Sequence, residues 1–201
     1  AGRGRYDIAE NDLVLVHHGV LHPNKANDRI IRAVAELRKD LPALHYLLVG
    51  SGPEMPILKQ LVRDLKMEDA VTFTGWLKTE AEVVEALNAA DIGLVMRIGL
   101  ESDNYHVTNT LVHEMACGLP IVSARLAGVA EIIRDTENGF LFDPADMELF
   151  KRRLLQLAAE PALRSRIGSL SRETATRLFD KTMIAKETAR LLLRVVYPEG
   201  L

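Results

Sequence analysis

The residues with the clearest capacity for chemistry lie between positions 108 and 120. This segment, TNTLVHEMACGLP, reads as a helix that carries one acid, Glu114, and that closes at Gly118 and Pro120 before an apolar strand. The N–H groups in the first turn of a helix have no partner within the helix, and they attract anions. We expect phosphates there, with Glu114 several residues further along, where its oxygens reach ligand hydroxyls. The segment therefore suggests a site for a nucleotide sugar.

A lysine follows the first apolar run of the chain. In GVLHPNK, residues 19–25, a tight turn brings Lys25 to the rim of the expected sheet, where its ammonium group can neutralise a diphosphate. The alternative interpretation is a solvated lysine at the start of a helix.

Strands alternate with helices along the rest of the chain. Apolar runs predict six strands, and residues at helical spacing predict the helices between them. The strands are expected at residues 13–20, 44–49, 71–74, 92–96, 121–123 and 140–142, and the helices at about 25–41, from 53, 81–90, 108–117 and 129–134. Such connections require parallel crossovers. The expected fold is an α/β, doubly wound parallel sheet with helices on both faces, whose ligands bind at the carboxyl ends of the strands.

Length and composition favour one domain. The chain has 201 residues, of which 48% are hydrophobic, enough for one core and too few for two full Rossmann-type domains. We expect a leader at residues 1–11, a sheet region at 12–143 and a helical tail at 144–201. The net charge of −3 excludes a uniform basic field for nucleic acid. The absence of a signal-peptide pattern and the single Cys117 favour a soluble, cytoplasmic protein.

A glycine turn follows the second strand. Ser51, Gly52, Pro53 and Glu54 open a helix, with Pro53 at its first position, so that the N–H groups of Glu54 and Met55 are expected to be available to an anion. A plain turn between a strand and a helix is equally compatible with these residues. The missing third glycine disfavours a dinucleotide fingerprint.

Four motifs occur in a fixed order at the ends of successive predicted strands: GVLHPNK, GSGPE, TGW and EMACGLP. Their order resembles the C-terminal, donor-binding half of GT-B glycosyltransferases of the glycogen synthase and bacterial mannosyltransferase type. The resemblance runs from about residue 12 to residue 180. It implies a Rossmann-like half of a GT-B fold, a retaining sugar transfer from a nucleotide diphosphate sugar, and no further cofactor.

The resemblance also implies roles for single residues. It makes Lys25 a phosphate ligand, with the backbone of Gly19 and Val20 beside it, although the family favours arginine at the position of Val20. Arg97, just beyond the fourth strand, could replace that arginine, but it could equally be a solvated surface residue.

At Trp76 and Leu77 the resemblance implies contact with the nucleotide base. Aromatic side chains more often fill cores than stack on ligands, so packing is the alternative for Trp76.

The family pattern also places two glutamates eight positions apart. Glu114 matches the second, which touches the ribose, whereas His106 stands where the first would touch the sugar. Histidine can donate a hydrogen bond or carry a positive charge, which suggests either different sugar hydroxyls or an acidic sugar; the alternative is a loop that no longer catalyses.

Thr108, Asn109 and Thr110 replace the usual Phe-Gly turn of the family. They either cap the helix or add ligand contacts. The five other histidines and Cys117 show no metal-site spacing, so no metal is expected.

A GT-B enzyme works in a cleft between two domains, and this chain supplies only one. The expected partners are a nucleotide sugar and a missing N-terminal acceptor domain, in the same or another chain, with membrane association only through that missing half. The alternative hypothesis is a nonenzymatic sugar-nucleotide-binding module or subunit.

Overall fold

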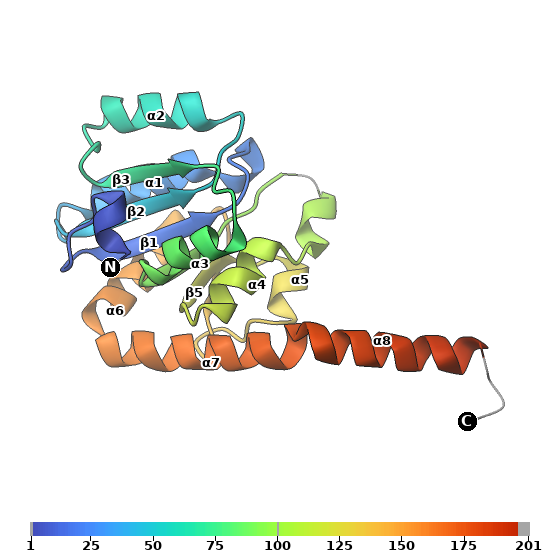
Figure 1. Ribbon diagram of the computed structural model, residues 1–201. Helices are drawn as coiled ribbons and strands as arrows, with labels where there is room; N and C mark the ends of the chain where they lie inside the picture. Colours follow the sequence, from blue (N-terminus) through green and yellow to red (C-terminus); the bar gives the residue numbers. More distant parts are fainter. Residues whose placement is uncertain (1, 100, 197–201) are drawn as a thin grey trace.

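A six-stranded parallel sheet forms the centre of the molecule. The computed structural model describes residues 2–99 and 101–196 (Figure 1). The strands are β1 (Leu13–His18), β2 (Leu44–Val49), β3 (Val71–Gly75), β4 (Ile92–Val95), β5 (Ile121–Ala124) and β6 (Phe140–Phe142), in the spatial order β3-β2-β1-β4-β5-β6. All pairings between neighbouring strands are parallel. The order reverses between β1 and β4, and open sheets bind ligands at this kind of switch point.

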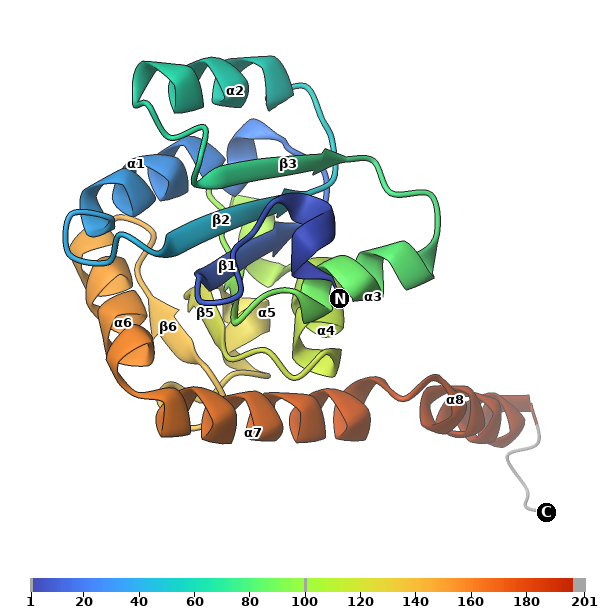
Figure 2. The same cartoon turned by 60° about the vertical axis from the view of Figure 1, so that its left-hand side comes forward.

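Helices cover both faces of this sheet. They are α1 (Asn27–Leu37), α2 (Met55–Asp64), α3 (Glu80–Asn88), α4 (Asn109–Ala116), α5 (Ala127–Ala130), α6 (Met147–Ala159), α7 (Pro161–Phe179) and α8 (Lys181–Val196). Helices α1 and α6 lie on one face, and α3 and α4 lie on the other (Figure 2). The six strands and the doubly wound arrangement predicted from the sequence are therefore confirmed.

The core follows from the hydrophobic pattern of the strands. All six residues of β2 are buried, as are the four central residues of β1, which is typical of parallel strands covered on both faces. On α1 the buried apolar residues Ile30, Val34 and Leu37 recur at helical spacing and turn toward the sheet.

Several predicted boundaries were wrong. Helix α2 begins at Met55 with Glu54 as its N-cap, so Pro53 precedes the helix instead of occupying its first position. Strand β1 ends at His18 rather than at position 20, because Gly19 turns the backbone with a φ of +140°. A 3-10 turn, Pro23–Lys25, precedes α1, which therefore begins at Asn27.

A further boundary error concerns α5, which occupies Ala127–Ala130 instead of 129–134. The backbone N–H of Ala127 donates to Oδ1 of Asn104, and a Cβ on Gly128 would lie 2.6 Å from the carbonyl oxygen of Tyr105. A distant loop therefore decides where this helix starts.

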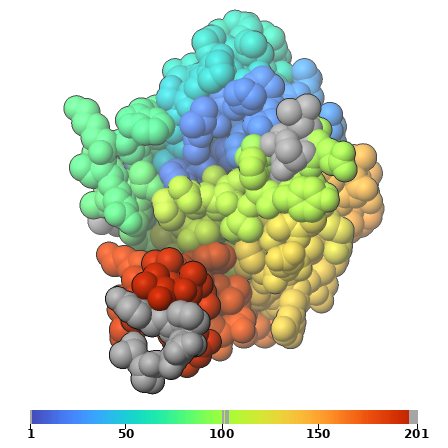
Figure 3. All heavy atoms as spheres, turned by 90° about the vertical axis from the view of Figure 1, so that its right-hand side faces the viewer, coloured from blue at the N-terminus to red at the C-terminus, as the bar shows by residue number. Residues whose placement is uncertain are grey.

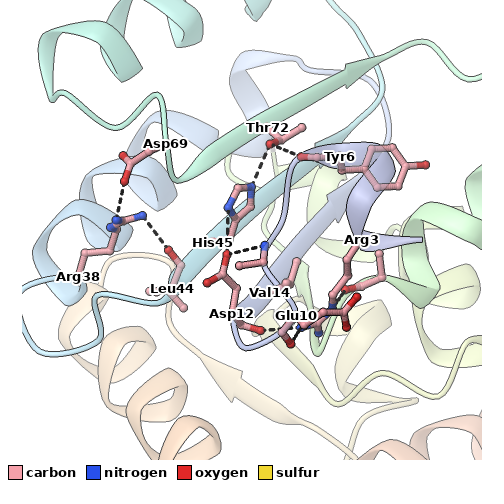
Figure 4. Close-up of polar contacts among 12 residues, drawn as sticks. Arg3, Tyr6, Glu10, Asp12, Val14, Arg38, Leu44, His45, Asp69 and Thr72 are labelled. Carbon is pink, nitrogen blue, oxygen red and sulfur yellow. Dashed lines mark hydrogen bonds and ion pairs between the residues drawn. The ribbon is translucent and has the colours of Figure 1, made fainter. Parts of the chain in front are cut away.

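An N-terminal hook, residues 3–8, closes the amino end of the sheet. It contains the 3-10 turn Arg3–Tyr6 and buries Tyr6 and Ile8. His45 on β2 meets Oγ1 of Thr72 at 2.9 Å, and that hydroxyl donates to the carbonyl oxygen of Tyr6 (Figure 4). These contacts lie at the edge of the sheet opposite to the carboxyl ends of the strands.

The two C-terminal helices, α7 and α8, differ in how they contact the rest of the molecule. Helix α7 packs along α4, whereas α8 extends beyond the body and buries none of its residues (Figure 1). Within the described ranges, no strand follows β6, which agrees with the predicted helical tail. A search of those same residues found no helix with both the length and the hydropathy needed to span a membrane.

Candidate functional site

A pocket opens at the carboxyl ends of the strands, next to the switch point between β1 and β4. Its volume is about 250 Å³. It is lined by the ends of β1 and β2, the segment after β3, helix α3 and the start of α4, through His18, Gly19, Val20, Val49, Gly50, Trp76, Leu77, Val83, Asn109 and Thr110. Figure 3 looks onto this side of the molecule, where these segments meet above the end of α8.

The pocket brings together part of the predicted site. Six predicted residues line it: Gly19, Val20, Trp76, Leu77, Asn109 and Thr110. The other predicted residues are not among its lining: Lys25, Ser51, Gly52, Pro53, Glu54, Arg97, His106, Thr108 and Glu114. Their contacts with a ligand stay predictions.

Two glycines let the β1 and β2 loops touch. A Cβ on Gly50 would lie 2.1 Å from the carbonyl oxygen of Gly19, and Gly50 has a φ of +130°. Any side chain there would push the loops apart and strain the backbone. These two residues therefore set the floor of the pocket.

The glycine turn after β2 binds protein instead of presenting free amides. A Cβ on Gly52 would lie 2.3 Å from the carbonyl oxygen of Leu21. That oxygen accepts from the N–H of Glu54 at 3.1 Å, and the N–H of Met55 donates to Gly52. The prediction that the Glu54 and Met55 amides are available to an anion was wrong, because the carbonyl oxygens of Leu21 and Gly52 already accept from them.

The start of α4 is held by its own side chains. Oγ1 of Thr108 accepts from the N–H of Leu111 at 3.4 Å, so Thr108 is a helix cap. The hydroxyl of Thr110 donates to the carbonyl oxygen of His18 at 2.6 Å and ties α4 to β1. Asn109 lies between them, exposed at the pocket.

Glu114 lies wholly inside the protein. Its Oε1 accepts from the N–H of His18 at 3.3 Å, whereas its Oε2 is buried without a hydrogen-bond partner. A Cβ on Gly93 would lie 2.6 Å from Oε2, so the bare backbone of Gly93 makes room for the carboxyl group. Burial raises the pKa of Glu114 well above its ordinary value, against the smaller opposing effects of the His18 N–H and the Lys25 charge.

Lys25 and Glu114 belong to the same region of the molecule. Lys25 ends the turn before α1 and is partly buried. Its positive charge lowers the pKa of Glu114, although less than burial raises it, and it contributes to the low pKa of His17. Lys25 and Glu114 therefore do not lie on opposite sides of the molecule.

The outer wall of the pocket is apolar and exposed. Trp76 is 69% exposed and Val20 is 49% exposed. Trp76 is thus not a core residue, and its indole is accessible at the pocket. Val20 presents an isopropyl group at the position where the resemblance favours arginine.

Arg97 and His106 both lie in the loop between β4 and α4. The N–H of Ile98 donates to the carbonyl oxygen of Asn24 at 2.8 Å, which places Arg97 beside the turn that carries Lys25. His106 is exposed and follows the 3-10 turn Glu101–Tyr105.

His18 is a pocket residue that the sequence analysis did not select. Its ring stacks on that of His113 with the centroids 5.3 Å apart and the planes 30° apart. Burial, with a smaller contribution from His113, lowers the pKa of His18 to about 4. The alternation of side chains along β1 could have placed His18 on the face that α4 covers, but the expected strand ran two residues too far.

Among residues 2–99 and 101–196, no group of three His, Cys, Asp or Glu side chains is arranged to hold a metal ion.

Similar proteins have been solved with the same architecture. HepE from Anabaena, in complex with UDP-glucose, is 25% identical and superimposes with a TM-score of 0.82 over 94% of this chain and 50% of its own. The C-terminal domain of LpcC, a glycosyl transferase group 1 family protein from Francisella tularensis, is 19% identical with a TM-score of 0.75, covering 90% of this chain and 92% of that domain.

The sequence comparisons agree with this architecture. EpsD, a putative glycosyltransferase of Bacillus subtilis, is 30% identical over 93% of the chain, and the N-acetyl-alpha-D-glucosaminyl L-malate synthase of Bacillus anthracis is 29% identical over 90%. These matches cover 47% and 45% of the two relatives, so the chain spans about half of their length. Residues 12–160 match the family described as glycosyl transferases group 1. The chain therefore belongs to the glycosyl transferases group 1 family and has the fold of one Rossmann-like half of a GT-B protein.

Proposed function

We propose that this chain is the donor-binding half of a glycosyltransferase that moves a sugar from a nucleotide diphosphate sugar to an acceptor with retention of configuration. The observation that carries the proposal is the pocket at the switch point, bordered by the first turn of α4 and close to the region of Lys25. A similar protein, HepE, was solved with UDP-glucose. We further propose that residues 1–201 form a single domain, with a leader at 1–11, the sheet region at 12–143 and the helical tail at 144–201.

In this proposal the ligand spans two environments. The apolar pocket beside Trp76 and Leu77 receives the nucleoside. The first-turn N–H groups of α4 and the ammonium of Lys25 receive the diphosphate, because helix N-termini and cations both stabilise anions. During transfer the same groups stabilise the negative charge that develops on the departing diphosphate.

Glu114 acts from beneath the pocket in this arrangement. Its Oε1 holds the N–H of His18 and so fixes the end of β1 against α4. The contact between Glu114 and the ribose, which the resemblance implies, stays a prediction, because the side chain is 0% exposed in this structure.

The binding role is tested with the chain and variants of Lys25. Lys25→Ala should weaken UDP binding about tenfold or more in calorimetry, because a hydrogen bond to a charged group contributes about 1.5–3 kcal/mol. Uridine affinity should not change. Lys39→Ala, at an exposed position in the turn after α1, is the matched control. If the unaltered chain binds none of UDP, GDP, ADP and their common sugars, the proposed function is wrong.

A second candidate is a sugar-nucleotide-binding subunit without activity. It is favoured by Val20 at the pocket and by His106, which replace the arginine and glutamate of the family pattern. Assaying sugar transfer with the full-length protein distinguishes the two. Binding without transfer to any acceptor, or to water, supports the subunit.

A further inference from the structure

Among the described residues that line the pocket, His18 is the one with a titratable side chain. The other lining residues are glycines, apolar side chains, Trp76, Asn109 and Thr110, so no Lys, Arg, Asp or Glu of residues 2–99 and 101–196 lines the pocket. The hydroxyl of Thr110 already donates to the backbone of His18. An uncharged, mostly apolar pocket suits the nucleoside part of a nucleotide rather than its phosphates.

Helix α4 holds His18 at three points. Oε1 of Glu114 accepts from its N–H at 3.3 Å, and the hydroxyl of Thr110 donates to its carbonyl oxygen at 2.6 Å. The ring of His113 stacks on the His18 ring. Because all three contacts come from one helix, the imidazole is pre-organised, and a ligand need not order it on binding.

The protonation state of His18 defines what it can offer. Its pKa of about 4, lowered first by burial and then by His113, keeps the ring neutral near pH 7. A neutral imidazole has one N–H and one acceptor nitrogen. Nδ1 is buried without a hydrogen-bond partner, and burying an unsatisfied N–H there would be costly. The proton therefore belongs on Nε2.

We propose that His18 is a specificity residue whose Nε2–H donates to an oxygen of the nucleoside, on the base or the ribose. This inference rests on the proposed function, because it requires a nucleotide ligand in the pocket. It assigns the recognition of the uncharged half of the ligand to the β1 end, and that of the diphosphate to Lys25 and the α4 N-terminus. Discrimination between ligands with and without that oxygen follows from the fixed ring.

Calorimetry with His18→Phe tests the proposal, with UDP and inorganic pyrophosphate as probes. Phenylalanine keeps the flat ring against His113 and removes the nitrogens. We expect UDP affinity to fall about three- to tenfold, the effect of one neutral hydrogen bond, and pyrophosphate affinity to stay the same. Gln60→Phe, at an exposed position of α2 outside the pocket, is the matched control and should bind both probes as the unaltered chain does.

Two results would overturn the proposal. One is an unchanged UDP affinity in His18→Phe; the other is an equal loss of affinity for UDP and pyrophosphate, which would place the effect on the phosphates or on folding. An unaltered chain that binds neither probe, and none of GDP, ADP and the common nucleotide sugars, would instead refute the proposed function itself. Nitrogen-15 NMR of the unaltered chain gives a second readout: the His18 Nε2 signal should be protonated at pH 7 and should shift with UDP, and a proton on Nδ1 or no shift would count against the proposal.

Discussion

At the scale of single residues, the position of the Glu114 side chain on α4 depends on Gly93 in the neighbouring strand β4. The carboxyl group fills the space beside Gly93, and one of its oxygens has no hydrogen-bond partner. An ionised carboxylate in such a place loses its hydration without full compensation. The pKa of Glu114 is raised because burial destabilises the carboxylate more than the neutral acid.

Glu114→Gln should therefore stabilise the chain increasingly as the pH rises. The amide keeps an oxygen for the His18 N–H and cannot ionise, whereas Glu114 loses stability as the pH rises through its folded pKa. Each unit of pKa shift corresponds to about 1.4 kcal/mol. Urea unfolding at pH 5.5 and pH 8.5 measures the difference between the two proteins. The same difference at both pH values would show that folded and unfolded chains ionise Glu114 alike in this range, which would contradict the raised pKa.

At the scale of elements, the N-terminal hook is anchored by one arginine. Arg3 donates to the carbonyl oxygens of Ala89, Glu10 and Asp12 and forms an ion pair of 2.8 Å with Asp91. The Asp91 carboxylate also accepts from the N–H of Val14 on β1. Arg3 therefore joins the hook, β1 and the segment before β4.

Arg3→Ala should lower the free energy of unfolding by about 1–3 kcal/mol, because it leaves partly buried acceptors without their donor. Arg5→Ala is the matched control, since its pairs with Glu82 and Glu85 are exposed and exposed pairs contribute little. Thermal unfolding of the two variants makes the comparison. Equal losses would mean that the hook is held by Tyr6 and Ile8 alone.

At the scale of the whole molecule, buried histidines link stability to pH. Burial lowers the pKa of His17 and His18 to about 4 and also lowers the pKa of His45. The unfolded chain takes up these protons near pH 6.5, and the folded chain takes up those of His17 and His18 only near pH 4. Between these values the unfolded state binds more protons, so stability falls as the pH falls.

The free energy of unfolding should decrease steadily from pH 6.5 to pH 4, measured by urea unfolding at several pH values. Glu114 opposes this trend, because its raised pKa makes the folded chain take up a proton first. Glu114→Gln should consequently lose stability more steeply on acidification than the unaltered chain. A flat profile, or a rise toward pH 4, would contradict the assignment of neutral buried histidines.

The sequence by itself determined those features that depend on neighbouring residues. The alternation of strands and helices follows from hydrophobic periodicity, and the Thr108 cap of α4 follows from local turn chemistry. The placement of Gly19, Trp76 and Asn109 at the carboxyl ends of the strands follows from the order of these elements. Each inference needed only a short window of the chain.

Only the tertiary structure decided which groups meet across the sheet. The Leu21 carbonyl takes the Glu54 N–H, Gly93 admits the buried Glu114 side chain, and His18 turns toward α4. These contacts join residues 21 to 96 positions apart in the chain, and no local pattern encodes them. Burial then sets the pKa values of Glu114 and His18, because desolvation depends on everything that surrounds a group rather than on its neighbours in the chain.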